Sequence, residues 1–201
     1  MPNDYERRNS LRHPHHDYTQ AGAYFVTFCA HNGRSLFGRV EDGIMILNPL
    51  GQIADQAWHE FAERHPEVDL DIFIIMPNHG HVVLWIKHDP ESIEREIPGK
   101  ERKFGDAIPG SLSTLIGAYK STVTQKAKNS GLIPGPPLWQ RNFHDHIVRN
   151  QEELARIREY IRTNLANWLT DQLHPLAPPN EFNRSWRVSD PLLGHQQGAD
   201  Q

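Results

Sequence analysis

The sequence is poor in cysteine and lacks long apolar runs. Its single cysteine, Cys29, excludes an internal disulfide and every zinc site built from several cysteines. No window approaches the roughly 20 consecutive apolar residues of a membrane span, and the first residues lack the apolar centre of a signal peptide. We therefore expect a cytoplasmic protein with no membrane partner, in which His, Asp, Glu, Asn or Gln side chains hold any metal.

The chain also has no overall excess of positive charge, since 21 Lys and Arg residues against 25 Asp and Glu residues give a net charge of −4. Taken alone, this value argues weakly against a nucleic-acid partner. The charge is segregated, however: residues 40–101 carry four basic and thirteen acidic groups, and residues 102–162 carry ten basic and five acidic groups. This pattern is compatible with a phosphate-binding face beside a divalent-cation site. It is equally compatible with ordinary solvated surfaces.

The composition, 37% hydrophobic and 23% charged, is typical of one globular domain. The sequence contains no internal repeat. We expect a flexible basic leader at 1–17, which could become ordered on DNA, a single domain at 18–171 and a Pro- and Gln-rich tail at 172–201.

Hydrophobic periodicity predicts the elements of this domain. Alternating or β-branched runs predict strands at 24–29, 68–76 and 79–87, and a hairpin at 41–47. Three- and four-residue steps predict helices at 48–64, 112–127 and 151–169, while 87–110 reads as a loop and 139–149 as extended. The order predicts an α+β, ferredoxin-like (RRM-like) sandwich, with an antiparallel sheet and helices on one face.

Two histidines share one face of the expected central strand. The period of two in a strand turns His79 and His81 to the same side, and residues two apart lie about 6.6 Å apart at Cα. Two ring nitrogens can then converge on one ion, which needs a third ligand. The alternative is that both are ordinary polar residues on an exposed face.

A tyrosine and a carboxamide lie one turn apart on the last predicted helix. Tyr160 and Asn164 form one stripe at the edge of its apolar face, with Arg156 a turn earlier. By itself Tyr160 could simply pack against the core. Together with the His pair, however, Asn164 can complete a cation site that holds a phosphate within reach of the tyrosine hydroxyl.

Four ordered blocks carry a family resemblance. They are 75–81 (IMPNHGH), 138–143 (LWQRNF), 146–150 (HIVRN) and 160–164 (YIRTN). Together these blocks resemble the tyrosine transposases of the IS200 type, and more closely their REP-associated relatives in the HUH single-strand endonuclease superfamily. The resemblance covers about residues 18–171 and rests on the ordered set more than on any one block.

This resemblance implies a metal-dependent transposase that cleaves and rejoins single-stranded or hairpin DNA. It implies that His79, His81 and Asn164 bind Mg²⁺ or Mn²⁺, and that Tyr160 is the nucleophile that forms a 5′-phosphotyrosine bond. Members of the family act as monomers or homodimers. The chain has no Walker-type glycine loop, which agrees with strand transfer that needs no nucleotide.

The sequence departs from the family in two places. Gly80 lies between the two histidines where the family has a bulky apolar residue, so we expect a lost core contact and looser ligands. Leu165 replaces a proline after Asn164, so we expect the helix to continue slightly further.

Several side chains are candidates for contacts with DNA. Phosphate contacts are expected from basic residues and base stacking from aromatic ones. The set is Lys120, Lys126, Arg141, Arg149, Arg156, Trp139 and His146. Trp139 could instead fill the core, and His146 could form a second metal pair with His144.

Tyr119 is the rival nucleophile, because it also lies on a helix and has a lysine beside it. Its position on the apolar stripe predicts burial, which favours Tyr160. Two other functions stay open. One is a catalytically silent single-stranded nucleic-acid-binding module on the same scaffold. The other is a metal-dependent hydrolase of a small phosphoester, which would leave Tyr160 unused.

Overall fold

The computed structural model describes residues 16–87, 108–133 and 137–178. Most of the expected leader and tail, and most of the expected 87–110 loop, lie outside these ranges. The elements follow in the order β1 (Gly22–Cys29), a 3-10 turn (His31–Gly33), β2 (Gly38–Glu41), β3 (Ile44–Leu47), α1 (Pro49–Arg64), β4 (Val68–Ile75), β5 (His79–Ile86), α2 (Leu112–Asn129), β6 (His144–Val148), α3 (Gln151–Thr163) and a 3-10 turn (Trp168–Thr170). No helix in these ranges has the length and apolarity to cross a bilayer.

The main sheet has the strand order β4-β5-β1-β6, and every neighbouring pair is antiparallel. This order and the sequence β1-α1-β4-β5-α2-β6 are those of a ferredoxin-like sandwich. The α+β prediction is therefore confirmed, with the His pair on the interior strand β5. β2 and β3 form a separate two-stranded sheet that leads into α1.

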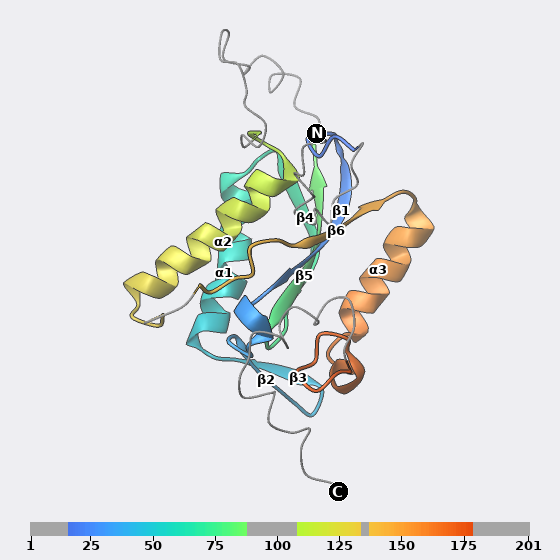
Figure 1. Ribbon diagram of the computed structural model, residues 1–201. Helices are drawn as coiled ribbons and strands as arrows, with labels where there is room; N and C mark the ends of the chain where they lie inside the picture. The colour runs from blue at the N-terminus through green and yellow to red at the C-terminus, as the bar shows by residue number, and fades with distance from the viewer. Residues whose placement is uncertain (1–15, 88–107, 134–136, 179–201) are drawn as a thin grey trace, which may run out of the picture.

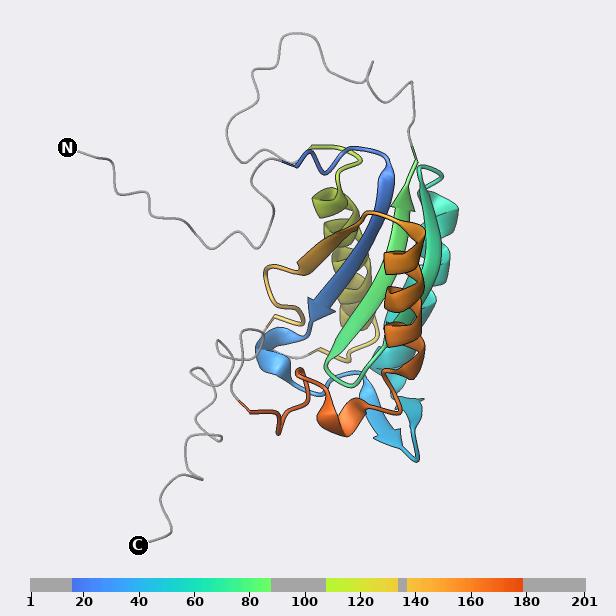
Figure 2. The same cartoon turned by 90° about the vertical axis from the view of Figure 1, so that its right-hand side faces the viewer.

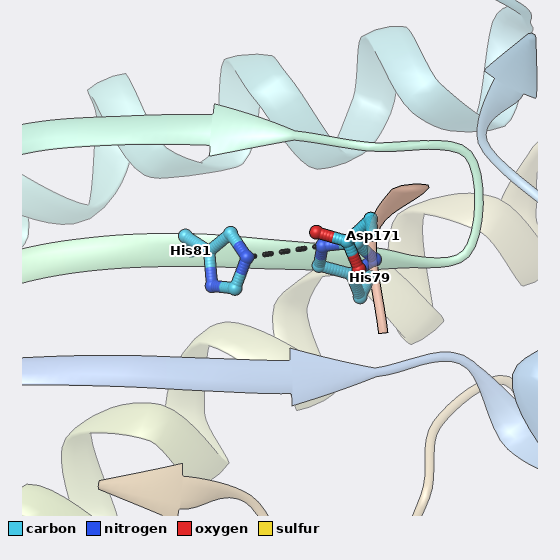
Figure 3. Close-up of side chains that lie close together, drawn as sticks. All are labelled: His79, His81 and Asp171. Carbon is cyan, nitrogen blue, oxygen red and sulfur yellow. Dashed lines mark hydrogen bonds between the residues drawn. The ribbon is translucent and has the colours of Figure 1, made fainter. Parts of the chain in front are cut away.

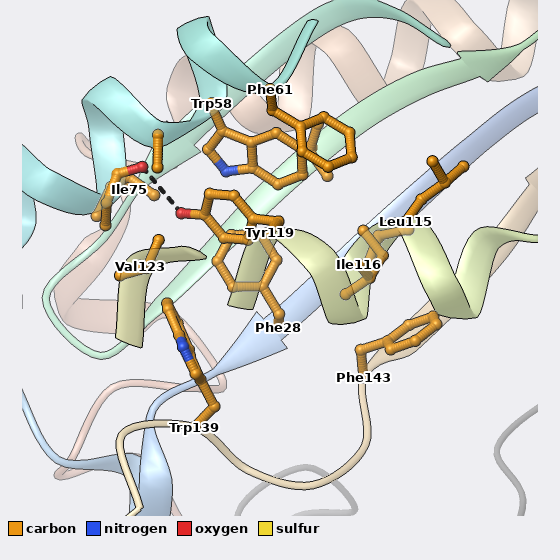
Figure 4. Packing of buried hydrophobic residues seen from close by; sticks show 14 of the residues in the cluster. Phe28, Trp58, Phe61, Ile75, Leu115, Ile116, Tyr119, Val123, Trp139 and Phe143 are labelled. Atoms are coloured by element: carbon orange, nitrogen blue, oxygen red, sulfur yellow. Dashed lines mark hydrogen bonds between the residues drawn. The ribbon is translucent and has the colours of Figure 1, made fainter. Parts of the chain in front are cut away.

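Helices α1 and α2 cover one face of the sheet, as the sequence predicts (Figure 1). Polar caps start both helices, since the Asn48 side chain accepts a hydrogen bond from the Gly51 amide and the Ser111 side chain accepts one from the Thr114 amide. Aromatic rings fill the layer between helices and sheet (Figure 4). Tyr119 stacks on Trp58 with ring centroids 3.9 Å apart, and both side chains are fully buried.

Helix α3 lies on the opposite face of the sheet, which corrects the expectation that the helices share one face (Figures 1 and 2). The reason is that alternate side chains of a strand point to opposite faces of the sheet. Val83 and Phe25 therefore point away from α1 and α2, and these apolar side chains must be buried by another element. Leu154 and Ile161 of α3 cover them. Helix α3 thus covers part of the second face of the sheet.

The end of the domain also differs from the expectation. Helix α3 ends at Thr163 rather than near residue 169. The chain continues in turns that lead to the 3-10 turn. Leu173 and Ala177 are then 4% and 8% exposed, so the packed structure continues past the domain boundary expected at residue 171.

Candidate active site

The two imidazoles of the His pair meet on the α3 side of the sheet. His79 and His81 are 0% and 2% exposed, and their Nε2 atoms lie 3.1 Å apart (Figure 3). Two nitrogens bound to one ion at about 2.1 Å are separated by about 3 Å when they are adjacent ligands. The pair is therefore arranged as two ligands of one cation would be.

The outer nitrogens of the pair have partners that fix the rings. The Asn78 amide nitrogen donates to the carbonyls of Gly33 and Leu173, at 3.1 and 2.7 Å, so the Asn78 carboxamide oxygen must face His79. That oxygen lies 2.8 Å from Nδ1 of His79, which therefore donates its proton and leaves Nε2 with a lone pair. On the other ring, the Thr27 hydroxyl lies 2.8 Å from Nδ1 of His81.

Both histidines are neutral at neutral pH. Burial lowers the pKa of His79 well below its ordinary value, and the neighbouring His81 lowers it further. Burial lowers the pKa of His81 to about 3. A neutral imidazole is the form that binds a metal, so the strand presents two ligands without first losing protons.

Helix α3 carries the expected nucleophile to the pair. The Asn150 side chain caps the helix, and the Arg158 guanidinium pairs with Asp71, with Nε 2.8 Å from Oδ1. Asp71 lies at a register shift in β4, where the extra residue turns its carboxylate toward α3. This anchor and the apolar contacts set the Tyr160 hydroxyl 3.3 Å from Nε2 of His81 while leaving the tyrosine 44% exposed.

Asn164 lies one turn later and is 2% exposed. Its amide nitrogen donates to Asp171 at 3.1 Å. Its carboxamide oxygen is buried and has no hydrogen-bond partner among the described residues. A buried acceptor of this kind is costly unless a donor or a cation meets it. The orphaned oxygen therefore fits the role of metal ligand that the sequence predicts.

Asp171 lies beside the His pair, and the sequence reasoning did not predict this. A ring nitrogen of His79, one of His81 and a carboxylate oxygen of Asp171 all lie within 4.8 Å of one another. Figure 3 shows the carboxylate over the His79 ring. Burial and, secondarily, the charge of Asp171 raise the pKa of Tyr160 to about 12. No periodic signal marks Asp171, because it follows a helix end in an irregular segment.

A cavity of about 700 Å³ opens beside these groups. Its wall includes His81, Tyr160 and Asn164, together with residues of the edge strand β6 and of the segment after α3. The further lining residues are Phe25, Thr27, His144, Asp145, His146, Asn167, Thr170, Asp171, Gln172 and Leu173. The expected nucleophile thus shares one cavity with two of the three expected ligands, His81 and Asn164, whereas His79 is not among the lining residues.

Four of the expected DNA contacts are exposed. Arg141, Arg149 and Arg156 are open to solvent, and His146 lines the cavity. The His146 ring bonds to Glu153, with Nε2 2.7 Å from the carboxylate. In the described part of the chain, His144 and His146 belong to no group of three metal-ligating side chains, and the His79 group is the one found.

The other three expected DNA contacts lie on the α1 and α2 side of the sheet, away from Tyr160. Lys120 is 9% exposed and donates to the carbonyls of Gln140 and Asn142, at 3.0 and 2.9 Å. Trp139 is 8% exposed and packs in the core. Lys126 pairs with Glu60. The expectation for Lys120 and Trp139 is therefore wrong, because both are used to hold the 138–143 loop on the core.

Tyr119 has no exposed surface, and its hydroxyl donates to the Ala54 carbonyl at 3.0 Å. Burial raises its pKa well above the ordinary value. DNA cannot reach a hydroxyl enclosed in this way, which favours Tyr160 as the nucleophile.

The space beside Gly80 is filled by another side chain. A Cβ at this position would lie 2.4 Å from Cζ of Phe28, so the Phe28 ring occupies the place of the missing side chain. Phe28 and Gly80 are register partners in β1 and β5, and both are buried. The expected loss of a core contact is thus wrong, because the neighbouring strand supplies it.

Comparisons with known proteins relate the chain to two proteins of one organism and to one solved fold. No family model matches the chain. An uncharacterized protein of Haemophilus influenzae is 34% identical over 171 residues, which cover 83% of this chain and 93% of that protein. A second protein of that organism, provisionally named a REP-associated tyrosine transposase, is 22% identical over 148 residues, or 74% of this chain and 72% of that protein.

A solved structure of a REP-associated tyrosine transposase bound to a REP hairpin has the same fold. Its TM-score to this chain is 0.54, with 18% sequence identity over 78% of this chain and 74% of that one. The resemblance indicated by the sequence blocks is therefore confirmed at the level of the fold.

Proposed function

Because the chain belongs to the family of the uncharacterized Haemophilus influenzae protein and has the fold of a REP-associated tyrosine transposase, we propose that it is a metal-dependent DNA strand transferase. Its substrate in this proposal is single-stranded or hairpin DNA in the prokaryotic cytoplasm. The observation that carries the proposal is the position of the Tyr160 hydroxyl, 3.3 Å from Nε2 of His81 and in a shared cavity with Asn164.

His79, His81 and Asn164 would hold the cation, Mg²⁺ or Mn²⁺. Two buried neutral imidazoles with converging Nε2 atoms and an orphaned carboxamide oxygen support this assignment. When bound, such a cation neutralises charge on the scissile phosphate and fixes its orientation for in-line attack. Asn78 and Thr27 hold the two rings in the orientation that this role needs.

Tyr160 would attack the phosphorus atom. A bond forms between the phenolic oxygen and phosphorus, and the bond from phosphorus to the 3′ oxygen breaks. The phenol proton passes to solvent, and the departing 3′ oxygen takes up a proton. The product is a 5′-phosphotyrosine and a free 3′-OH, which can attack the same bond in reverse and rejoin the strands without a nucleotide.

The reaction depends on how helix α3 positions the Tyr160 hydroxyl relative to the phosphate. The raised pKa of Tyr160 leaves little phenolate at neutral pH, so a phosphate must be held close to the hydroxyl for attack to occur. The Arg158 to Asp71 pair fixes the helix on the sheet, and with it the distance between Tyr160 and the His pair.

The DNA would lie along the β6 side of the cavity. Arg149 directly follows the edge strand β6, Arg156 lies one turn before Tyr160 on α3, and Arg141 precedes β6; all three are exposed. Each can contribute a phosphate contact, so binding is expected to weaken as salt rises. The solved neighbour of the same fold holds a REP hairpin, which supports a folded DNA ligand for this chain.

The test is incubation of the protein with a labelled hairpin oligonucleotide and Mg²⁺ or Mn²⁺, followed by a denaturing gel. We expect a covalent adduct with the wild type and with Tyr119→Phe, and none with Tyr160→Phe or His81→Ala. Tight hairpin binding without any adduct would instead identify a catalytically silent DNA-binding module. An adduct that survives Tyr160→Phe would refute the assignment of the nucleophile.

A further inference from the structure

The segment after α3 folds back over the His pair. The Trp168 and His79 rings lie 5.9 Å apart between centroids, and Leu173 accepts the hydrogen bond from Asn78. His79 has no exposed surface. The segment thereby closes one side of the proposed cation site. It also places the carboxylate of Asp171 beside the two histidines (Figure 3).

The Asp171 carboxylate is held by two hydrogen bonds. Its Oδ1 accepts from the Leu173 amide at 2.6 Å, and its Oδ2 accepts from the Asn164 side chain at 3.1 Å. The second bond fixes which end of the Asn164 carboxamide is nitrogen. It therefore leaves the orphaned Asn164 oxygen as the atom available to a cation.

We propose that Asp171 is an anionic ligand of the cation and also orients Asn164, so that the site consists of two imidazoles, one carboxylate and one carboxamide. This inference rests on the proposed function and adds a ligand and a metal preference to it. Two ligand atoms of one ion at about 2.1 Å lie at most about 4.2 Å apart. The observed limit of 4.8 Å needs a shift on the order of half an ångström.

Charge supports a carboxylate in this place. An imidazole that binds a metal is neutral, and so is a carboxamide, so a divalent cation held by His79, His81 and Asn164 alone would keep both charges in a largely buried site. Asp171 removes one of those charges. Its carboxylate oxygens can ligate through their remaining lone pairs while keeping both hydrogen bonds.

The donor set also selects among cations. Two imidazoles and one carboxylate with open positions suit first-row transition metals, whereas Mg²⁺ prefers an octahedral shell of oxygens. We therefore expect the protein to bind Mn²⁺ more tightly than Mg²⁺.

The experiment measures Mn²⁺ binding to the full chain without DNA, by calorimetry and by the EPR signal of free Mn²⁺. Asp171→Asn keeps an oxygen that can accept from Asn164 but removes the charge, and we expect it to weaken binding at least tenfold. Asp171→Ala should weaken binding further. The matched control is Asp69→Asn, which removes an exposed carboxylate paired with Lys87 and should bind as the wild type does.

Wild-type Mn²⁺ affinity in Asp171→Asn would overturn the inference. If Mn²⁺ affinity then fell in Asp171→Ala alone, Asp171 would orient Asn164 without ligating the cation. Thermal unfolding checks each variant, and Asp171→Ser is a second charge-removing variant if Asp171→Asn does not fold. The hairpin adduct assay on the wild type separates the two proposals. If Mn²⁺ binding depends on Asp171 but no adduct forms, only the proposed function is refuted. If an adduct forms but Asp171→Asn binds Mn²⁺ as the wild type does, only this inference is refuted.

Discussion

Replacing Gly80 with alanine is expected to destabilise the sheet between the two histidines. The new Cβ would lie 2.4 Å from Cζ and 2.6 Å from Cε2 of Phe28, where ordinary contacts are 3.4–4 Å. The ring must therefore move by about 1 Å. It cannot do so freely, because Trp58, Tyr119 and Trp139 surround it at centroid distances of 5.8, 5.2 and 5.5 Å.

The magnitude follows from two opposed effects. Overpacking of a core costs about 1–3 kcal/mol. Alanine in place of glycine within a strand returns about 0.5–1 kcal/mol, because the unfolded chain loses less freedom on folding. Because the 2.4 Å contact is far shorter than an ordinary one, the overpacking cost lies in the upper part of its range, and the net expectation is a loss of about 1–2.5 kcal/mol in the free energy of unfolding. Since His79 and His81 flank Gly80, Mn²⁺ affinity should fall as well.

Urea denaturation followed by tryptophan fluorescence measures the effect. Phe28→Leu shortens the clashing side chain, so the double variant should be more stable than the sum of the single effects by at least about 0.5 kcal/mol. Gly117→Ala on α2 is the control, because nothing lies within 4 Å of its Cβ, and it should stabilise the protein. A Gly80→Ala variant as stable as the wild type, or strictly additive effects, would refute the reasoning.

Three further results are expected. Tyr119→Phe removes the bond to the Ala54 carbonyl and should cost about 1 kcal/mol in urea titrations, while adduct yield stays at the wild-type level. In EDTA, the free energy of unfolding should fall as the pH drops below about 6.5, the ordinary pKa of histidine. The pKa values of His79 and His81 are lowered in the folded protein, so the unfolded chain takes up protons that the folded chain does not. The loss is at most about 1.4 kcal/mol per pH unit for each imidazole. A His79→Gln, His81→Gln variant should flatten this pH dependence, and an unchanged slope would contradict the burial of neutral rings. Arg158→Ala should lower the rate of adduct formation, since α3 loses its ion pair with Asp71; an unchanged rate would show that the apolar contacts alone position Tyr160.

Local sequence patterns sufficed for much of the fold. The strand period turned His79 and His81 to one face, and the helical period separated buried Tyr119 from exposed Tyr160. These features depend on neighbours within a few residues. The face that α3 covers could not be predicted in this way, because it depends on how the whole sheet is already covered by α1 and α2.

The remaining misses come from contacts between distant residues. Phe28 fills the space above Gly80, although 52 positions separate them. Lys120 is buried because loop carbonyls about 20 positions away accept its hydrogen bonds. Asp171 reaches the His pair because the chain reverses after α3. None of these pairings leaves a periodic signal in a single sequence.

The most direct measurement identifies the residue that carries DNA after the reaction. The wild-type protein is incubated with a hairpin oligonucleotide and Mn²⁺, digested with nuclease and trypsin, and analysed by mass spectrometry. Trypsin cleaves after Arg158 and Arg162, so Tyr160 falls on a four-residue peptide distinct from the peptide that carries Tyr119. The account predicts a nucleotide linked through phosphate to Tyr160. A nucleotide on Tyr119, or on no tyrosine despite hairpin cleavage, would contradict it.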